Sequence, residues 1–549
     1  MKKLLTLAWL LLSSLLAAAQ PANPVAFTSS NLPIVVINTL GGTIVDDPKI
    51  TAYMGIVNNP AGARNYLANA YNDYHNKIGI ELRGSSSQSF PQKSYSIESR
   101  DITNVEHDTT ILGMPAENAW ILYAPYDDKT CLRNVLSYRI ANRTGHYASR
   151  TRYCELVLNG QYQGIYVLME KIKRDANRVN IKKLETTDIS GNKLTGGYII
   201  KIDKPTGSGG TYGWVSQQRS ATSNKLINFL YEYPSADDIV PQQKAYIKAY
   251  VDSAETALAS ATFTSPTTGY AKFIDVNSFI DYFILNEVSR NVDGYRLSTY
   301  LYKNRRSEGG KLVAGPVWDY NLGWWNANYC SGNLATGWAY NFNSVCGTDD
   351  HQVPFWWQRL LQDPAFTAAL KCRWTDLRKT TLHLDTLNKF IDANVAQLTE
   401  ARTRHFTAWP ILGVYTWPNP TPIPATYPAE ITALKNWMTQ RLTWLDANMP
   451  GTCNRPLAAQ AACAAASSQV FPNPFDAGLT FSTTLPASAL VQAELRDITG
   501  QTVGRWSFGT LAAGPHELPL PTSTSLAAGI YFLRATVGEE TINLKVAKR

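Results

Sequence analysis

The spacing of hydrophobic and polar positions changes along the chain, and the change falls near residue 237. Before it, short apolar or alternating runs at 32–38, 78–83 and 93–98 predict β-strands. After it, apolar residues recur at helical spacing. The helices that this spacing predicts cover residues 236–260, 276–290, 352–380, 382–404 and 428–448. A strand-rich first half that leads into a helical second half indicates an α+β domain.

Two further elements are predicted in the strand-rich half. Residues 130–143 carry apolar side chains at helical spacing. Strands at 153–158 and 164–169 flank Asn159-Gly160, which is the strongest short-range signal for a β-hairpin. Glu170 ends the second strand, where the chain leaves this half. A segment at such a place can offer backbone groups to an adenine ring, although an exposed strand-end glutamate also fits the sequence.

Lys93 begins a predicted strand shortly after a loop of small residues, Gly-Ser-Ser-Ser at 84–87. The backbone amides of such a loop can cradle phosphate oxygens, and a lysine beside it can reach the same phosphates. An ordinary solvated lysine on a strand remains the alternative.

The most informative stretch is 291–321, in which two acidic residues bracket a predicted hairpin. Residues 298–303 and 311–317 are strand-like, with turn residues between them. An antiparallel hairpin returns to the end where it started, so we expect Asp293 and Asp319 to lie close together although 26 positions separate them. Two such carboxylates can hold a divalent cation and accept a proton beside it, which phosphoryl transfer requires.

The two ends of the chain have their own composition. Residues 1–19 combine Lys2-Lys3, an apolar run and a small-residue site, which predicts a secretory signal peptide. No later apolar run is long enough to cross a membrane. Residues 451–469 are rich in Ala and Ser and are predicted to be a linker that follows a main domain at 20–450. Residues 470–549 show short alternating strands with turns, which indicates a small antiparallel β-sandwich.

Charge and aromatic content narrow the functional classes. The net charge is +8 over 549 residues with no dense Lys/Arg block, so nucleic acid is not expected as the main partner. The chain has 15 Trp and 29 Tyr, which suits an extracellular protein that handles polymers or sugars. The doublets Trp324-Trp325 and Trp356-Trp357 can stack on sugars, but packing in the core is the favoured interpretation.

The cysteines are expected to be structural in an oxidising compartment. Cys330–Cys346 and Cys453–Cys463 are the predicted disulfides, with Cys131–Cys154 as a weaker third. The chain contains no HExxH or CxxC pattern, no GxSxG elbow and no GxxxxGK[ST] loop. These absences argue against a zinc hydrolase, a serine hydrolase and a P-loop nucleotide-binding protein.

The joint occurrence of several segments carries a family resemblance over roughly residues 30–400. LRGSSSQSFPQKSYSI, LRNVLSYRI, NGQYQGIYVLMEKI, NEVSRNVDGYRLSTYLYK and GPVWDYNLGWWNANYC resemble the CotH family, known as atypical secreted protein kinases. The motif VFPNPF, the strand GIYFLRA and the basic end KVAKR resemble the C-terminal sorting domain of type IX secretion substrates.

The resemblance implies a diminished two-lobed kinase-like domain that binds ATP between its lobes. It implies that Asp293 is the catalytic aspartate and that Asp319 binds Mg²⁺ or Mn²⁺. It also implies, less directly, that Lys93 faces the phosphates and that Glu170 lies at the hinge. Ordinary kinases place a metal-binding Asn five residues after the catalytic Asp, where this chain has Ser298. Asn321 or Asn291 is the expected substitute, unless the site holds one metal ion instead of two.

The sequence therefore predicts a secreted or cell-surface enzyme, exported through the periplasm, that phosphorylates Ser or Thr of a protein or of itself. Residues 470–549 are expected to engage the type IX secretion machinery. Two alternatives stay open. One is a non-catalytic surface or matrix protein on a kinase-like scaffold, with a glycan as its candidate ligand. The other is a glycosidase that uses Asp293 and Asp319 as its two carboxylates.

Overall fold

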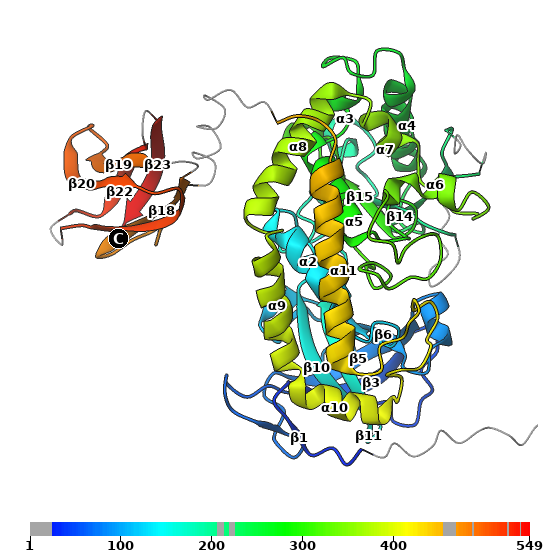
Figure 1. Ribbon diagram of the computed structural model, residues 1–549. Helices are drawn as coiled ribbons and strands as arrows, with labels where there is room; N and C mark the ends of the chain where they lie inside the picture. The colour runs from blue at the N-terminus through cyan, green and yellow to red at the C-terminus, as the bar shows by residue number, and fades with distance from the viewer. Residues whose placement is uncertain are drawn as a thin grey trace, which may run out of the picture. The chain divides into compact units, whose positions relative to one another are not determined.

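The chain divides into two compact units, Met1–Thr452 and Cys453–Arg549 (Figure 1). The computed structural model describes residues 25–205, 213–218, 225–453, 468–485, 488–523, 526–537 and 540–549. The predicted signal peptide and residues 454–467 of the predicted linker lie outside the described residues.

The first half of the larger unit is a closed β-barrel. Around the barrel the strand order is β10 (Thr151–Leu158), β11 (Gln161–Glu170), β9 (Ala119–Tyr123), β6 (Ser94–Ser99), β5 (Tyr74–Arg83), β3 (Ile50–Val57) and β2 (Ile34–Asn38). Neighbours are antiparallel except β2 and β10, which close the barrel in parallel. The predicted hairpin at Asn159-Gly160 is confirmed, and both residues have the positive φ (50° and 77°) that tight hairpin turns of this kind require.

Short elements decorate the barrel. They are β1 (Ser29–Ser30), β4 (Asn65–Tyr66), β7 (Thr109–Ile111), β8 (Met114–Glu117) and the 3₁₀ turn η1 (Ser86–Ser89). The barrel interior is filled by apolar side chains such as Trp120, Ile78 and Leu168, all fully buried. The interior of the barrel is therefore a packed core.

A second, 5-stranded sheet follows the barrel in the chain. Its order is β13 (Trp214–Val215), β14 (Asn228–Tyr233), β12 (Tyr198–Ile202), β15 (Thr299–Lys303) and β16 (Leu312–Ala314). The last two strands are the hairpin predicted between Asp293 and Asp319, and it is confirmed by the pairing of Leu301 with Ala314.

Helices build the rest of this unit (Figure 1). They are α2 (Arg133–Arg143), α3 (Gly191–Leu194), α4 (Pro241–Ala259), α5 (Val276–Ser289), α6 (Phe342–Val345), α7 (Trp356–Leu360), α8 (Pro364–Lys379), α9 (Leu384–Gln397), α10 (Thr399–Ala408) and α11 (Tyr427–Asn448). The 3₁₀ turns are η2 (Tyr270–Lys272), η3 (Arg306–Glu308) and η4 (Ala339–Asn341). The single helix predicted over 352–380 is wrong, because Pro364 starts a new helix that Asp363 caps. The one predicted over 382–404 is also divided, between α9 and α10.

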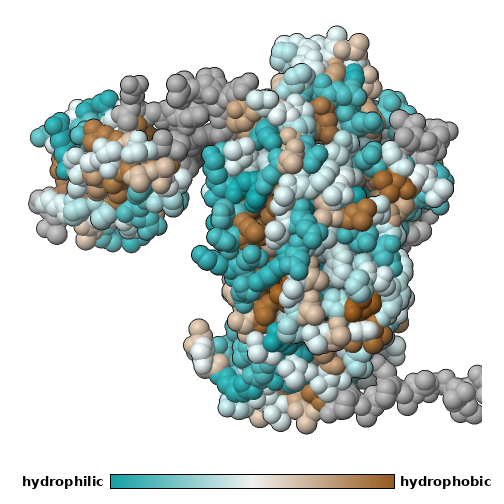
Figure 2. Space-filling model, viewed as in Figure 1, coloured by the Kyte–Doolittle hydropathy of each residue, from teal (hydrophilic) through white to brown (hydrophobic). Residues whose placement is uncertain are grey.

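Packing settles the role of most tryptophans in the doublets. Trp324, Trp356 and Trp357 are at most 4% exposed and lie in the main core, so these three are not available to stack on a sugar. On the face seen in Figure 2, hydrophobic residues are scattered among hydrophilic ones. Among the described residues, none of the helices is both long enough and apolar enough to span a bilayer.

The smaller unit consists of antiparallel sheets. One has the order β17 (Gln469–Phe471), β18 (Gly478–Leu485), β21 (Gly514–Pro521), and the other has β20 (Thr502–Leu511), β19 (Ala489–Asp497), β22 (Gly529–Val537), β23 (Glu540–Lys548). Alternating residues from both sheets share one core, which includes Phe481, Leu495 and Leu533. These strands agree with those predicted from the alternating pattern.

The cysteines follow the prediction in part. Cys330 and Cys346 form a disulfide, as expected. The predicted Cys131–Cys154 bond is wrong, because both thiols are free and they lie in different cores. Cys372 and Cys453 are each disulfide-bonded, whereas Cys463 lies outside the described residues.

A buried histidine, His405, links helix α10 to the barrel and should make the stability of the protein depend on pH. His405 is fully buried, and its Nδ1 accepts a hydrogen bond from the backbone N–H of Ile165 at 3.1 Å. Burial lowers the pKa of His405 from 6.5 to about 3, because the charged imidazolium is poorly solvated there. The unfolded chain therefore binds a proton that the folded chain does not, and stability is lost as the pH falls below 6.5.

We expect this histidine to cost about 2 kcal/mol of unfolding free energy between pH 6.5 and pH 5. Urea denaturation followed by tryptophan fluorescence at pH 7 and pH 5 measures it. His405→Asn, whose side-chain oxygen can still accept from Ile165, should flatten the pH dependence. His107→Asn, at an exposed position, should leave it unchanged. Equal slopes in all three proteins would contradict the assignment.

Candidate active site

Asp293, Asp319 and Asn321 line one cavity of about 200 Å³. The small-residue loop at 84–87 lines the same cavity, so the structure brings it together with these three predicted residues. The cavity also contains charged side chains that the sequence analysis did not select, namely Arg83, Asp127, Lys201, Asp203 and Lys204.

Asp319 is held by its backbone in a conformation that few residues adopt. It has φ 64°, in the left-handed region, where an aspartate is tolerated better than a branched residue. Its N–H donates to the hydroxyl of Tyr138 at 3.2 Å, and its carbonyl accepts from the amide of Asn291 at 3.1 Å. The next N–H, of Tyr320, donates to Asn134 at 2.6 Å. Helix α2 and the loop after α5 therefore fix the position of this carboxylate.

Crowding of carboxylates shapes the electrostatics of the cavity. Burial and the nearby charge of Asp293 raise the pKa of Asp319 to about 6, against the opposing effect of Arg83. Burial raises the pKa of Asp127 to about 7, although its hydrogen bond from Asn321 at 2.7 Å opposes the rise. Buried carboxylates with raised pKa values that repel one another are typical of functional sites.

Asp293 lies in the loop after α5 and is held on one side only. Its Oδ1 accepts hydrogen bonds from Arg296 at 2.7 Å and from the hydroxyl of Tyr329 at 3.4 Å. No hydrogen bond to its Oδ2 is found among the described residues, and the side chain is 21% exposed. One carboxylate oxygen is thus fixed, and the other is free to accept a proton.

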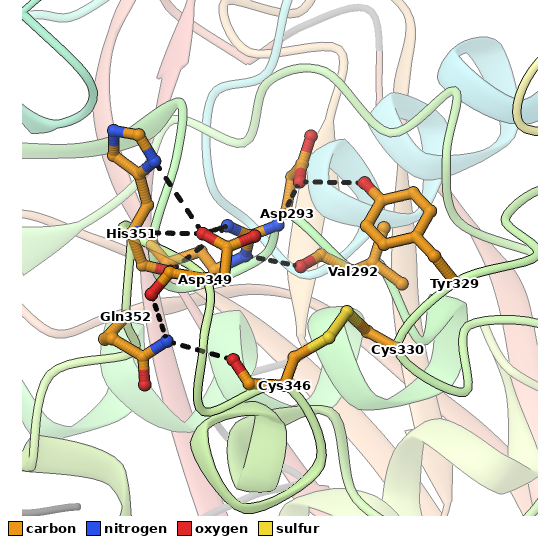
Figure 3. The surroundings of a disulfide bond; sticks show 9 residues. Val292, Asp293, Tyr329, Cys330, Cys346, Asp349, His351 and Gln352 are labelled. Carbon is orange, nitrogen blue, oxygen red and sulfur yellow. Dashed lines mark hydrogen bonds and ion pairs between the residues drawn. A yellow bond between two sulfur atoms is a disulfide. The ribbon is translucent and has the colours of Figure 1, made fainter. Parts of the chain in front are cut away.

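The support for Asp293 comes from the segment that the disulfide closes (Figure 3). Arg296 is buried and also binds Asp349 at 3.2 Å and the carbonyl of His351 at 3.1 Å. The carbonyl of Cys346 accepts from the N–H of Asp349 at 3.1 Å, while Tyr329 directly precedes Cys330. The disulfide therefore joins the two places that support Asp293. Tyr329, beside Cys330, binds Asp293 directly, and Asp349, hydrogen-bonded to Cys346, binds Arg296.

The glycine after Asp293 provides a stability prediction. A Cβ on Gly294 would lie 2.3 Å from the side-chain oxygen of Asn286, which is buried and accepts from the hydroxyl of Tyr320 at 3.0 Å. Gly294→Ala is therefore expected to lower the unfolding free energy by about 1–3 kcal/mol, because Asn286 cannot move freely. Chemical denaturation measures the loss.

The matched control is Gly347→Ala, whose Cβ would meet only the carbonyl oxygen of Asn343, at 3.1 Å. It should change stability far less. If the Gly294→Ala protein were as stable as the wild type, the loop around Asp293 would be able to shift and relieve the contact with Asn286.

The structure does not bring Lys93 or Glu170 into the cavity. The ammonium of Lys93 donates to the carbonyl of Gln88 at 2.6 Å, and the residue does not line the cavity. Glu170 is fully buried and pairs with Arg150 at 2.7 Å. Successive residues of a strand face opposite sides, so Met169 lines the cavity while Glu170 points away from it.

The cationic residues that sequence reasoning missed come from strand ends. Lys201, in β12, pairs with Glu232 of β14 at 3.1 Å. Burial alone would lower the pKa of Lys201. The nearby Glu232 and Tyr300 have a larger effect, and together they raise the pKa of Lys201. Arg83 ends β5, and its guanidinium lies 4.9 Å from the ring centroid of Trp318. The sequence feature that could have identified these residues is a charge within or at the end of an apolar strand. It occurs in YIIKIDK at 198–204 and at Arg83, just before the small-residue loop.

The oxygen donors of the cavity fit a hard cation such as Mg²⁺ or Mn²⁺. Carboxylate and amide oxygens are the ligands that these ions prefer, and Asp319 and Asn321 supply them in a buried, negatively charged corner. Over the part of the chain that the structure describes, no group of three or more His, Cys, Asp or Glu is arranged to hold a metal by itself. Magnesium sites in kinases have this character, because substrate phosphates and water complete the coordination.

Comparison with known proteins agrees with this picture. The family model described as CotH kinase protein matches residues 80–445, which contain every residue of the cavity named above. The model for a secretion system C-terminal sorting domain matches residues 469–549, which indicates a secreted or cell-surface protein. A search of curated proteins finds no match. The chain belongs to the CotH kinase family and carries a secretion sorting domain at its C-terminal end.

Proposed function

We propose that the protein is a secreted kinase that transfers the terminal phosphate of ATP to a Ser or Thr hydroxyl of a protein, or of itself, with a divalent metal ion. One observation carries the proposal. Asp293 and Asp319 share a cavity with three cationic side chains, which combines a proton acceptor, a metal ligand and phosphate-binding groups.

Asp319 and Asn321 would hold Mg²⁺ or Mn²⁺, with Asp127 oriented toward Asn321 by their hydrogen bond. When bound, such an ion neutralises charge on the phosphate oxygens. The ion would also offset the repulsion that raises the pKa of Asp319.

Asp293 would accept the proton of the attacking hydroxyl through its free oxygen. Its other oxygen is held by Arg296 and Tyr329, so the carboxylate is oriented. The rigid support keeps the proton acceptor in place during transfer.

Arg83, Lys201 and Lys204 would face the phosphates in the role that the family resemblance gave to Lys93. They converge on the cavity beside the loop at 84–87, whose backbone amides can also bind phosphate oxygens. The barrel and the helical half would act as the two lobes of a kinase-like domain. The end of β11 at Met169 would border the adenine, and Glu170 would anchor that strand end through Arg150.

The test is to incubate the purified full chain with ATP labelled at the terminal phosphate, with Mg²⁺ or Mn²⁺, and to look for self-labelling. A thermal-shift scan with ATP should show stabilisation only when metal is present, because a ligand that binds the folded state raises the melting temperature. No labelling and no metal-dependent shift would overturn the proposal.

A second candidate is a non-catalytic glycan-binding protein, and one observation favours it. Trp417 is 50% exposed at the cavity and stacks on Tyr329 with ring centroids 6.0 Å apart. An exposed tryptophan face is suited to a sugar ring. Stabilisation by soluble glycans, with none by nucleotide, would support this candidate. The sorting domain would in either case engage the type IX secretion machinery through residues 470–549.

A further inference from the structure

A second cavity, of about 440 Å³, lies on the larger unit between α2, the start of β10 and α9. It is distinct in charge from the candidate active site. Arg139, Arg143, Arg150 and Arg152 line it, and none of the described residues around it is an aspartate or a glutamate.

The arginines of this groove are unusually free of carboxylate partners. Arg139, Arg143 and Arg152 are exposed, and among the described residues none of them forms an ion pair with an acidic side chain. Arg150 does have such a partner, the buried Glu170. Three exposed arginines without acidic partners in one groove form a concentrated positive field.

Two of these side chains are already held in place. The guanidinium of Arg139 lies 4.4 Å from the ring centroid of Phe390 in α9. Arg152 donates from Nε to the carbonyl of Leu112 at 3.0 Å and from Nη1 to its neighbour Thr151 at 2.9 Å. An ordered guanidinium loses little conformational entropy on binding, and its planar fork matches a carboxylate or phosphate group.

We propose that this groove binds an acidic peptide segment of a partner protein, with Asp, Glu or phosphorylated side chains set against Arg139, Arg143 and Arg152. The size of the groove favours a short peptide over nucleic acid, which needs a long track of positive charge. Its walls also suit a peptide. Phe390 offers apolar contact, while the exposed Gln397 carries an amide that can bond to a peptide backbone.

The site is independent of phosphoryl transfer, although it shares a helix with the candidate active site. Arg139 and Arg143 lie on α2, and the same helix holds the backbone at Asp319 and Tyr320 through Tyr138 and Asn134. The proposal concerns binding alone, so it is tested without nucleotide and its result does not depend on the proposed kinase activity.

The experiment measures fluorescence anisotropy of a labelled eight-residue peptide of alternating Glu and Ser, and of the same peptide with phosphoserine, on the full chain. Arg139→Ala with Arg143→Ala should weaken binding at least about tenfold, because two charge-assisted contacts are lost. The control is Lys272→Ala with Lys379→Ala, which removes the same charge from exposed positions outside the groove. It should bind like the wild type.

Three outcomes would overturn the proposal. The first is no peptide binding by the wild type at physiological salt. The second is an equal loss in the control variant, which would show attraction by net charge only. The third is that sulfated polysaccharide or single-stranded DNA of equal charge binds while neither peptide does. Unchanged melting temperatures of both variants exclude a folding defect as the cause of any loss.

Discussion

Asp319→Asn is expected to abolish the metal-dependent stabilisation of the protein by ATP, with an affinity at least about 100-fold below that of the wild type. An asparagine keeps the size of the side chain and removes the charge that a divalent cation needs. It also tolerates the left-handed backbone at this position, φ 64°, so the fold should be preserved. Thermal shift at saturating Mg²⁺ or Mn²⁺ over a range of ATP concentrations measures the loss.

The metal-free Asp319→Asn protein should be at least as stable as the wild type at pH 7. The pKa of Asp319 is raised to about 6, which means that the ionised carboxylate is disfavoured in the folded state. Removing that charge removes the penalty. A loss of nucleotide binding together with a gain in stability would separate a functional role from a structural one.

The matched control for this variant is Glu255→Gln. Glu255 is also buried, with a pKa raised to about 7 by burial, but it lies in α4 away from the cavity. Its variant should keep the metal-dependent shift. If Asp319→Asn kept it as well, Asp319 would not be a metal ligand.

Asp293→Asn is expected to slow phosphoryl transfer by about 10²- to 10⁴-fold, the usual contribution of a general base, while nucleotide binding remains. The asparagine oxygen can still accept from Arg296, so the loop should stay in place. Initial rates of self-labelling and the thermal shift with ATP and metal measure the two effects separately.

The control for Asp293→Asn is the same substitution at an exposed aspartate, Asp350. Asp350 pairs with Lys225 at 2.6 Å and does not line the cavity, so Asp350→Asn should label at the wild-type rate. Full labelling by Asp293→Asn would remove Asp293 from the mechanism. Loss of both labelling and binding would assign it to nucleotide binding instead.

Local patterns were enough to predict much of the fold. The hairpin between Asp293 and Asp319 follows from two β-prone runs and a turn, which are short-range properties. The helices α2, α5 and α11 follow from apolar spacing. Closure of the barrel was not predictable in the same way, because β2 pairs with β10 more than a hundred residues later.

The site residues whose positions follow from the hairpin could be predicted from the sequence. Those whose positions depend on which face of a strand points into the cavity could not. That Asp293 and Asp319 lie at the same end of the hairpin follows from the hairpin itself. Whether a strand residue such as Lys201 faces the cavity depends on which face of its sheet is covered, and neither its spacing nor its type reveals that. Lys93 had the right neighbours in sequence, but its ammonium is bound by the carbonyl of Gln88.

The disulfide between Cys330 and Cys346 ties the geometry at Asp293 to the surroundings of the protein. Thiols remain reduced in the cytoplasm and become oxidised after export. The Cys330–Cys346 bond therefore forms only after the chain has left the cytoplasm. A chain with this disulfide open lacks the covalent link beside Tyr329 and near Asp349, so the segment that supports Asp293 and Arg296 is completed only after export.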